Sequence, residues 1–286
     1  MNALDKRLHA FREDLADERL EGRVQAGRFV AGTPARVGAP VADMLAAPDA
    51  GAGLNTQLLL GDEVLVFEER GDWAWVQAVR DNYVGYVARP AIEAAGGEIT
   101  HVVAVQRTFL YSGADLKLPR KACFSMGSRV SIDGFAETRG TRYAMLASGE
   151  ALIDAHLRPA GETEDDYVNV AEALLSTPYL WGGTSAFGID CSGLVQLSMR
   201  MTGRSVPRDT DMQASGLGEP IDPGAGMAGL IRGDLVFWKG HVAIMLDEKN
   251  IIHANGHTMT VSHEELRAAV ARIAYLYGGP TGFRRP

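Results

Sequence analysis

Cysteine is scarce in this chain of 286 residues, which contains only Cys123 and Cys191. Two cysteines are too few for a small domain held together by disulfides. Cys123 follows Ala122 and precedes Phe124, surroundings typical of a buried small hydrophobe. If Cys191 has a chemical role, the two cannot form a structural disulfide, so nothing in the sequence points to an oxidising compartment.

Long apolar runs and an excess of positive charge are also missing. No stretch approaches the ~20 apolar residues that span a bilayer, and the charged N-terminus is not followed by the apolar segment of a secretory signal peptide. With 28 Lys and Arg against 36 Asp and Glu, the net charge is -8. We therefore expect a cytoplasmic protein with neither a membrane nor a nucleic acid as its partner, and the alternative is export by another route. The sequence does not indicate an oligomeric state.

The N-terminal 30 residues carry apolar side chains at helical spacing. We predict a helical arm over residues 1–30, with one apolar face formed by Leu4, Leu8, Phe11, Leu15 and Leu20.

Residues 31–160 consist of short apolar runs separated by turns. The run at residues 61–66 resembles the run at 127–132, an offset of 127 − 61 = 66 residues, and each is followed by a turn and an aromatic strand. Short strands at this spacing are typical of small barrels. We predict two copies of one all-β unit, at residues 31–95 and 96–160.

Residues 161–286 begin with helix signals and continue with strand signals, an α+β pattern. Capping boxes are expected at Thr163 with Asp166 and at Ser262 with Glu265. The predicted strands are residues 234–238, 241–246, 250–254 and 258–261, with a last strand at 272–276.

Cys191 stands at the start of a helix-like run, behind a glycine-rich aromatic loop. Asp190 can cap this helix, and the helix dipole favours a thiolate there, which predicts a lowered pKa and a nucleophilic thiol. His241 and His253 follow, and the order cysteine, histidine, orienting polar group is that of papain-like thiol enzymes. Ser192 is rejected as a rival nucleophile because Asp190 occupies the glycine position that a nucleophile elbow requires.

A zinc site is the alternative role for His253, together with His257 and His263. Asn255-Gly256 would break a helix that placed two of these histidines on one face, and no cysteine pair accompanies them. We expect no metal and no cofactor.

Several ordered motifs resemble the NlpC-type family of papain-like cell-wall peptidases. The matching segments are residues 178–183, 190–193, 207–208, 233–237, 241–244 and 252–254. Several motifs over roughly 120 residues form a specific signal. The two all-β units resemble bacterial SH3-like domains. The resemblance implies a papain-like domain at 161–286 behind two small barrels.

The resemblance also implies roles for individual residues. Cys191 would be the nucleophile, His241 its general base and His253 the group that orients the imidazole. Substrate contacts are implied for Tyr179, Asp190, Ser192, Thr210 and, in the first SH3-like unit, Tyr83.

Asp190 and Tyr83 are the residues expected to recognise a free substrate amine. An acidic partner is expected just before Pro48, but Ala47 stands there and Asp49 is displaced.

The leading functional hypothesis is a cysteine peptidase of cell-wall recycling. It would take a murein tripeptide or tetrapeptide with a free N-terminal L-Ala. It would hydrolyse the bond between γ-D-glutamate and the diamino acid (diaminopimelate or lysine), releasing L-Ala-γ-D-Glu. Two alternatives are a peptidoglycan-binding module with vestigial catalysis, and an acyltransferase or amidase acting on another substrate.

Overall fold

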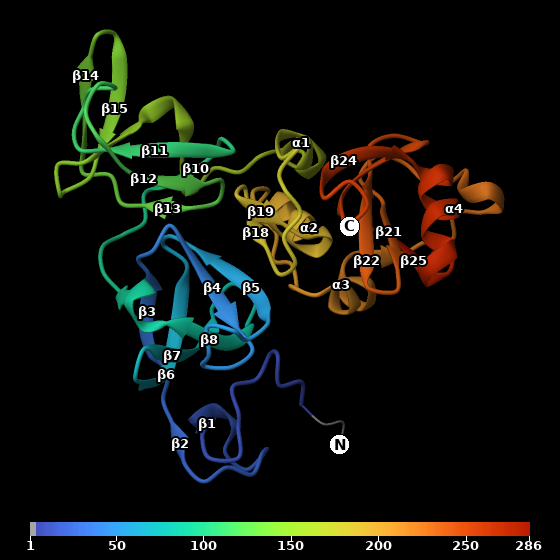
Figure 1. Ribbon diagram of the computed structural model, residues 1–286, viewed down its shortest axis with the longest axis horizontal. Helices are drawn as coiled ribbons and strands as arrows, with labels where there is room; N and C mark the ends of the chain where they lie inside the picture. The colour runs from blue at the N-terminus through green and yellow to red at the C-terminus, as the bar shows by residue number, and fades with distance from the viewer. Residues whose placement is uncertain (1–3) are drawn as a thin grey trace. The chain divides into compact units, whose positions relative to one another are not determined.

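The computed structural model describes residues 4–286 of the chain, which divide into two compact units (Figure 1). The first unit extends to Glu162 and the second is Thr163–Pro286. Among the described residues, no helix is long and apolar enough to cross a membrane.

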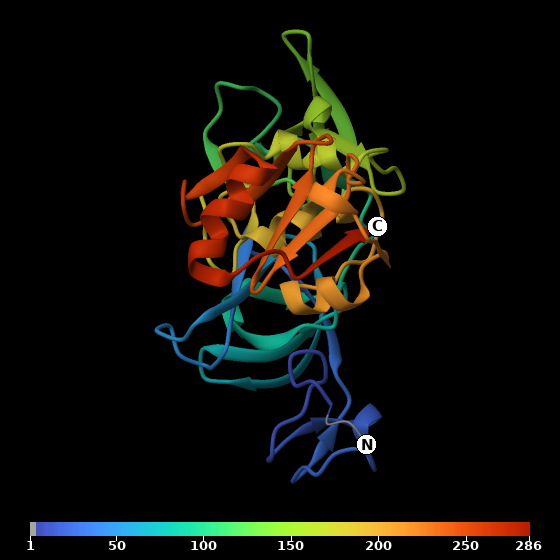
Figure 2. The ribbon, with the colours of Figure 1, turned by 90° about the vertical axis from the view of Figure 1, so that its right-hand side faces the viewer.

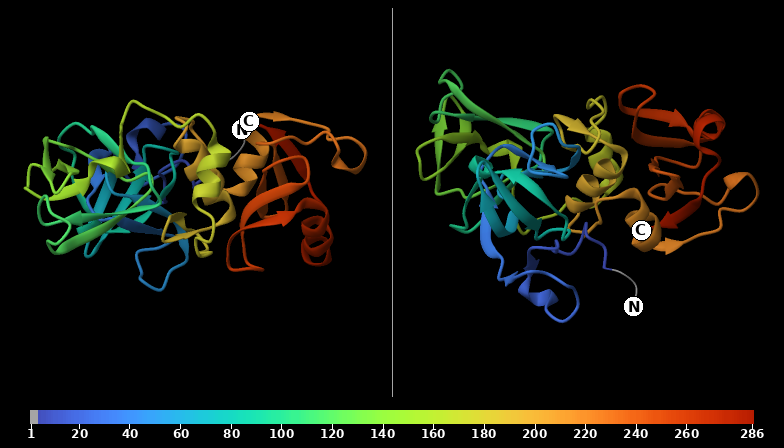
Figure 3. Two further views of the ribbon diagram at one scale, coloured as in Figure 1. Left: turned by 90° about the horizontal axis from the view of Figure 1, so that it is seen from above. Right: turned by 60° about the horizontal axis from the view of Figure 1, so that its bottom comes forward.

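Over the described residues 4–30 the N-terminal arm forms no α-helix, so the prediction of a helical arm over residues 1–30 is wrong there. Residues 1–3 of that prediction lie outside the described part of the chain. The described part contains two short strands and one 3-10 turn: β1 (Ala16–Asp17), η1 (Glu18–Leu20) and β2 (Phe29–Val30) (dark blue in Figure 3). Leu15 is fully buried in a cluster with Phe67 and Trp75 of the sheet that follows at residues 33–94. The apolar spacing therefore reflects a segment that packs against strands, and tertiary contacts override its helical periodicity.

Residues 33–94 form a seven-stranded sheet in the order β5-β4-β8-β7-β6-β3-β9. The strands are β3 (Thr33–Val37), β4 (Val41–Leu45), β5 (Leu54–Leu59), β6 (Glu63–Arg70), β7 (Trp73–Ala78), β8 (Val84–Ala88) and β9 (Ile92–Ala94), with η2 (Arg89–Ala91) before the last.

Residues 101–159 repeat this topology. Their strands are β10 (His101–Val103), β11 (Arg107–Tyr111), β12 (Arg120–Ser125), β13 (Arg129–Val130), β14 (Gly134–Thr138), β15 (Thr141–Met145), β16 (Ala151–Ile153) and β17 (Leu157–Pro159), with η3 (Asp154–His156) before the last. β10 pairs with β13 and β17 as β3 pairs with β6 and β9, and β11 pairs with β12 and β16 as β4 pairs with β5 and β8. The second copy divides the long β6 into β13 and β14, so its sheet separates into two.

The second unit has four helices among its residues: α1 (Tyr167–Ala173), α2 (Cys191–Arg200), α3 (Thr210–Gly216) and α4 (Leu266–Tyr277). Its main sheet has the order β20-β25-β21-β22-β23-β24. These strands are β20 (Glu219–Pro220), β21 (Leu235–Trp238), β22 (His241–Met245), β23 (Asn250–Asn255), β24 (Thr260–Glu265) and β25 (Gly282–Arg285). Two shorter strands, β18 (Thr184–Ser185) and β19 (Gly188–Ile189), form a hairpin before α2, and η4 (Ala225–Met227) precedes β21. Helix α4 lies along the sheet (red in Figure 2) and packs Leu266, Ala269 and Ile273 into a core with β21, β22 and β23.

Three local predictions in this unit were wrong. Residues 272–276 belong to α4 and not to a strand, because Leu266, Ala269 and Ile273 recur at helical spacing toward the sheet. Helices α1 and α4 are each capped by one side chain rather than by a reciprocal pair. The Asp166 side chain accepts the Val168 N–H in α1, and the Glu265 side chain accepts the Ala268 N–H in α4. Neither capping box forms as predicted.

Candidate active site

Cys191 is the first residue of α2, as the sequence predicts, and Asp190 is its N-cap. The Asp190 carboxylate accepts the Gly193 N–H at 2.7 Å and the Gly182 N–H at 2.9 Å. The glycine loop approaches the helix so closely that a Cβ on Gly193 would lie 2.3 Å from the Gly183 carbonyl oxygen. The loop and cap thus fix the start of α2 and the direction of the Cys191 side chain.

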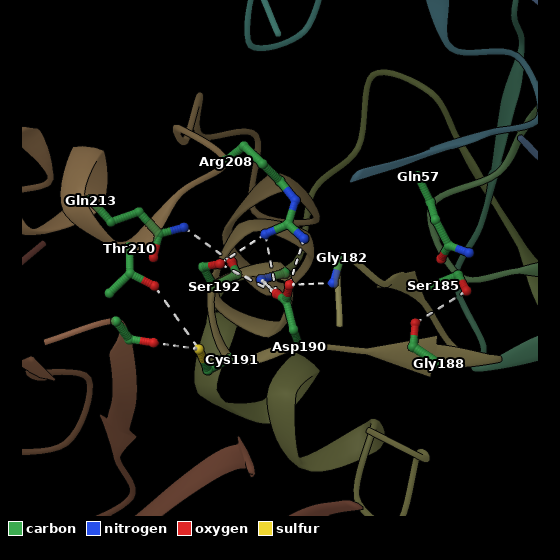
Figure 4. Close-up of polar contacts among 12 residues, drawn as sticks. Gln57, Gly182, Ser185, Gly188, Asp190, Cys191, Ser192, Arg208, Thr210 and Gln213 are labelled. Atoms are coloured by element: carbon green, nitrogen blue, oxygen red, sulfur yellow. Dashed lines mark hydrogen bonds and ion pairs between the residues drawn. The ribbon is translucent and has the colours of Figure 1, made fainter. Parts of the chain in front are cut away.

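The Cys191 thiol faces two other segments of the same unit. Its Sγ lies 3.9 Å from Thr210 Oγ1 and 4.0 Å from the Gly240 carbonyl oxygen (Figure 4). It also accepts a hydrogen bond from the Val242 backbone N–H. Gly240 and Val242 flank His241, so the start of β22 brings the backbone of this histidine next to the thiol.

The ionisation of Cys191 differs from the expectation of a lowered pKa. Burial raises the pKa of Cys191 to about 11, and the negative charge of Asp190 adds to this; the Val242 and Thr210 hydrogen bonds and the charge of Arg208 only partly oppose the increase. The helix start favours the thiolate, but burial disfavours it more strongly. The resting thiol is therefore protonated at neutral pH.

A chain of side chains extends from His241 to helix α4. His241 Nε2 is 2.9 Å from His253 Nδ1, and His253 Nε2 is 3.1 Å from Glu264 Oε2. Arg272 binds Glu264 through both carboxylate oxygens, at 2.9 Å from Nε and 2.5 Å from Nη2. His241 uses Nε2 toward His253, which leaves Nδ1 as its nitrogen for the thiol.

Both histidines are neutral in the folded chain. Burial, together with the neighbouring His253 and Arg272, lowers the pKa of His241 to about 3. Burial also lowers the pKa of His253 to about 4, although Glu264 opposes the shift. A neutral imidazole can accept the proton of a thiol within its reach.

Arg208 neutralises Asp190 in the interior. Its Nη2 lies 2.6 Å and its Nη1 3.1 Å from the two Asp190 oxygens, and Nη1 also donates to Ser192 Oγ at 2.8 Å (Figure 4). Arg208 is only 1% exposed. Gln213 of α3 donates to the Ser192 carbonyl at 3.0 Å and to the Pro207 carbonyl at 2.9 Å, which ties this network to the next helix.

The predicted site residues of the second unit lie together. Burial, with Cys191 and Asp190 close by, raises the pKa of the half-buried Tyr179, so its hydroxyl stays protonated near the thiol. Thr210 contacts the thiol directly. Tyr83 is buried in the first unit, next to β8, and its role remains a prediction.

The expectation that Asp190 binds a substrate ammonium also remains a prediction. Its oxygens already accept from Arg208, two backbone N–H groups and, at 3.3 Å, the Ser192 hydroxyl. Asp49 follows Pro48 instead of preceding it. Its carboxylate stabilises its own loop by accepting the Gly51 N–H at 2.8 Å.

Three charged residues of the site were not predicted. Arg208 lies in a matched motif but had no assigned role, and Glu264 and Arg272 lie outside every motif. Glu264 could have been found from the alternation of β24, since it shares a face with Ser262, the cross-strand partner of His253. No sequence signal marks Arg272 as its partner.

Comparison with known proteins identifies two domains. The NlpC/P60 family model matches residues 176–278, and the bacterial dipeptidyl-peptidase SH3 domain model matches residues 44–92. The chain is 29% identical over 224 residues to a gamma-D-glutamyl-L-lysine dipeptidyl-peptidase of Bacillus subtilis, covering 70% of this chain and 72% of that protein. It is 28% identical over 238 residues to dipeptidyl-peptidase 6 of Lysinibacillus sphaericus, covering 76% and 86%.

A solved structure has the same fold. The crystal structure of an NlpC/P60 family protein from Bacillus cereus superposes with a TM-score of 0.73 at 23% identity, covering 88% of this chain and 99% of that one. The predicted papain-like α+β domain behind an SH3-like domain is therefore confirmed. The second all-β copy repeats the pairings of the first, and its assignment as an SH3-like domain remains a prediction.

Proposed function

Since this chain is a cysteine peptidase with an NlpC/P60 domain behind a bacterial SH3-type domain, we propose that it cleaves the bond between γ-D-glutamate and the diamino acid of murein peptides. The substrate carries a free N-terminal L-Ala, and the released product is L-Ala-γ-D-Glu. The observation that carries the proposal is the Cys191 thiol at the start of α2, against the residues flanking His241. The name of the 29% identical Bacillus subtilis relative supports the choice of bond.

The first chemical step is attack by Cys191 Sγ on the carbonyl carbon of the γ-amide. Because both the thiol and His241 are neutral at rest, the proton moves from Sγ to His241 Nδ1 as the C–S bond forms. In this proposal the Cys191 backbone N–H donates to the developing oxyanion, since the first N–H groups of a helix have no carbonyl partner within it. His241 then gives its proton to the departing amine, which leaves a thioester on Cys191.

The second step is hydrolysis of the thioester. His241 takes a proton from water as the water attacks the thioester carbon, and returns it to the Cys191 sulfur as the C–S bond breaks. The hydrogen bond from His241 to the fully buried His253 keeps the imidazole oriented through both steps.

The proposal includes a biological setting. A peptide with a free L-Ala amine has already been detached from the glycan, so the reaction belongs to the turnover of released wall peptides, in our proposal in the cytoplasm.

The test is mass spectrometry of the full chain incubated with L-Ala-γ-D-Glu-L-Lys, beside its N-acetylated form and the corresponding diaminopimelate peptide. We expect cleavage of the free-amine peptides only. Equal cleavage of the N-acetylated form would contradict the amine requirement. Binding without cleavage would support the wall-binding module. Turnover of another acyl substrate alone would support the acyltransferase or amidase.

A further inference from the structure

Glu264 of β24 lies next to the buried His253, at the end of the histidine pair away from Cys191, and takes no part in the proposed proton transfers. Residue His253 of β23 is opposite Ser262 in the sheet, and Glu264 follows two positions later on the same face. Its carboxylate Oε2 is 3.1 Å from His253 Nε2. Side chains in this diagonal relation on one face of a sheet are within reach of each other.

Arg272 keeps Glu264 ionised and in place. The guanidinium contacts both carboxylate oxygens from α4, and this hydrogen bonding lowers the pKa of Glu264. An ionised carboxylate can only accept hydrogen bonds. Apart from Glu264, the charged or titratable groups that act on His253 are Arg272, His241 and His257.

We infer that Glu264, held by Arg272, is a positioning residue that sets the tautomers of His253 and His241. The negative carboxylate, 3.1 Å away, favours the proton of His253 on Nε2, which leaves Nδ1 bare. The contact is electrostatic, because its angle lies outside hydrogen-bond geometry and Nε2 has no aligned acceptor among the described residues. Bare Nδ1 accepts the Nε2–H of His241 across 2.9 Å. His241 Nδ1 is then unprotonated and available to Cys191.

The opposite tautomers would stop the reaction. If His253 carried its proton on Nδ1, it would donate to His241 Nε2, and the His241 proton would lie on Nδ1, toward the thiol. The base would then be blocked although every side chain kept its position. The inference rests on the proposed function for its catalytic consequence, but not for the tautomers themselves.

The primary test needs no substrate: histidine-selective ¹⁵N NMR of the full chain at pH 7. We expect both His253 and His241 to carry the proton on Nε2. In Glu264→Gln, the amide N–H₂ can donate to His253 Nε2, so the resonances should change to the Nδ1–H form. Nδ1–H on either histidine in the unsubstituted chain would overturn the inference, whether or not the murein peptide is a substrate.

Kinetics give the second readout. Glu264→Gln should lower kcat at least about 100-fold with little change in KM, as expected for a wrong tautomer. Glu264→Asp keeps an acceptor and should retain more activity than Glu264→Gln. The matched control is Glu172→Gln, which removes an Arg-paired carboxylate on α1 that contacts Arg232 and should leave kcat unchanged. A folded Glu264→Gln with kcat within twofold of the unsubstituted chain would also overturn the inference.

Discussion

The Cys191 thiol is protonated at rest because burial opposes its ionisation. We predict that ultraviolet absorbance of the thiolate, and alkylation by iodoacetamide, increase only as the pH rises above 9 toward about 11. Cys191→Ala supplies the baseline, since it retains Cys123, whose pKa burial also raises. Full thiolate absorbance at pH 7 would show a preformed ion pair and contradict the proposed step in which proton transfer accompanies attack.

The buried pair of Arg208 and Asp190 stabilises the start of α2. Replacing Arg208 with Met would leave the Asp190 charge buried with only hydroxyl and amide donors, which costs about 3–5 kcal/mol of unfolding free energy. The control is Arg232→Met, which breaks exposed ion pairs with Asp166 and Glu172 and should cost at most about 1 kcal/mol. Urea unfolding measures both, and equal losses would contradict the assigned role.

At the scale of single residues, the sequence predicts the positions that belong to ordered motifs. The sequence predicts Cys191, the Asp190 cap, His241 and His253 because their spacing and neighbours are constrained, and the structure places Cys191 after its cap and the two histidines in contact. Arg208 is different: a single arginine in a sequence is usually solvated, and its burial depends on where Asp190 lies in three dimensions. The direction of the Cys191 pKa shift was missed for the same reason, since burial is a property of the folded unit.

At the level of elements, the start of α2 depends on contact with the glycine loop. Alanine normally favours a helix over glycine by about 1 kcal/mol. Gly193→Ala should nevertheless destabilise the fold by about 1–3 kcal/mol, because the added Cβ would meet the Gly183 carbonyl oxygen at 2.3 Å. It should also lower kcat by displacing Cys191.

Gly216→Ala is the matched control at the end of α3, where an added Cβ meets nothing within 4 Å. Thermal unfolding of the two variants should show a loss for Gly193→Ala and little change for Gly216→Ala. A stability gain for Gly193→Ala would show that the loop and helix are not packed as described.

Helical and strand periodicity predict elements only where burial follows the same pattern. The sequence predicts β22 and β23 from short continuous apolar runs, because both strands are buried on both faces. Two segments were predicted wrongly. The arm before Gly22 was predicted as a helix but contains a short strand and a 3-10 turn, and residues 272–276 were predicted as a strand but belong to α4. In both, the packing partner is distant in sequence: Phe67 and Trp75 for Leu15, and β21 to β23 for Ile273.

At the scale of the whole molecule, the neutral histidines make stability depend on pH. The unfolded chain protonates histidine near pH 6.5, whereas His253 and His241 in the fold resist protonation down to about 4 and 3. The unfolded state therefore binds more protons below pH 6.5, and stability falls as the pH decreases through this window. His156 of the first unit contributes with the same sign.

We expect the urea midpoint of the unsubstituted chain to decrease between pH 7 and pH 4.5. His253→Asn removes one of the titrating groups, so its midpoint should start lower but change less over the same interval. Parallel decreases in the two proteins would mean that His253 does not resist protonation in the fold.

The offset of 66 residues between two apolar runs predicts that the first unit contains two copies of one all-β arrangement. The strand pairings repeat accordingly. Tyr83 and Cys191 belong to different units, so no motif within one unit links them, and the amine-binding role of Tyr83 stays a prediction.

The central claim is that Cys191 carries the acyl group of a murein peptide. The most direct measurement is rapid acid quench of the full chain with L-Ala-γ-D-Glu-L-Lys, followed by mass spectrometry of the proteolytic fragments. The account predicts an L-Ala-γ-D-Glu acyl adduct on the fragment with Cys191, and no adduct or turnover in folded Cys191→Ala. Undiminished cleavage by Cys191→Ala would contradict it.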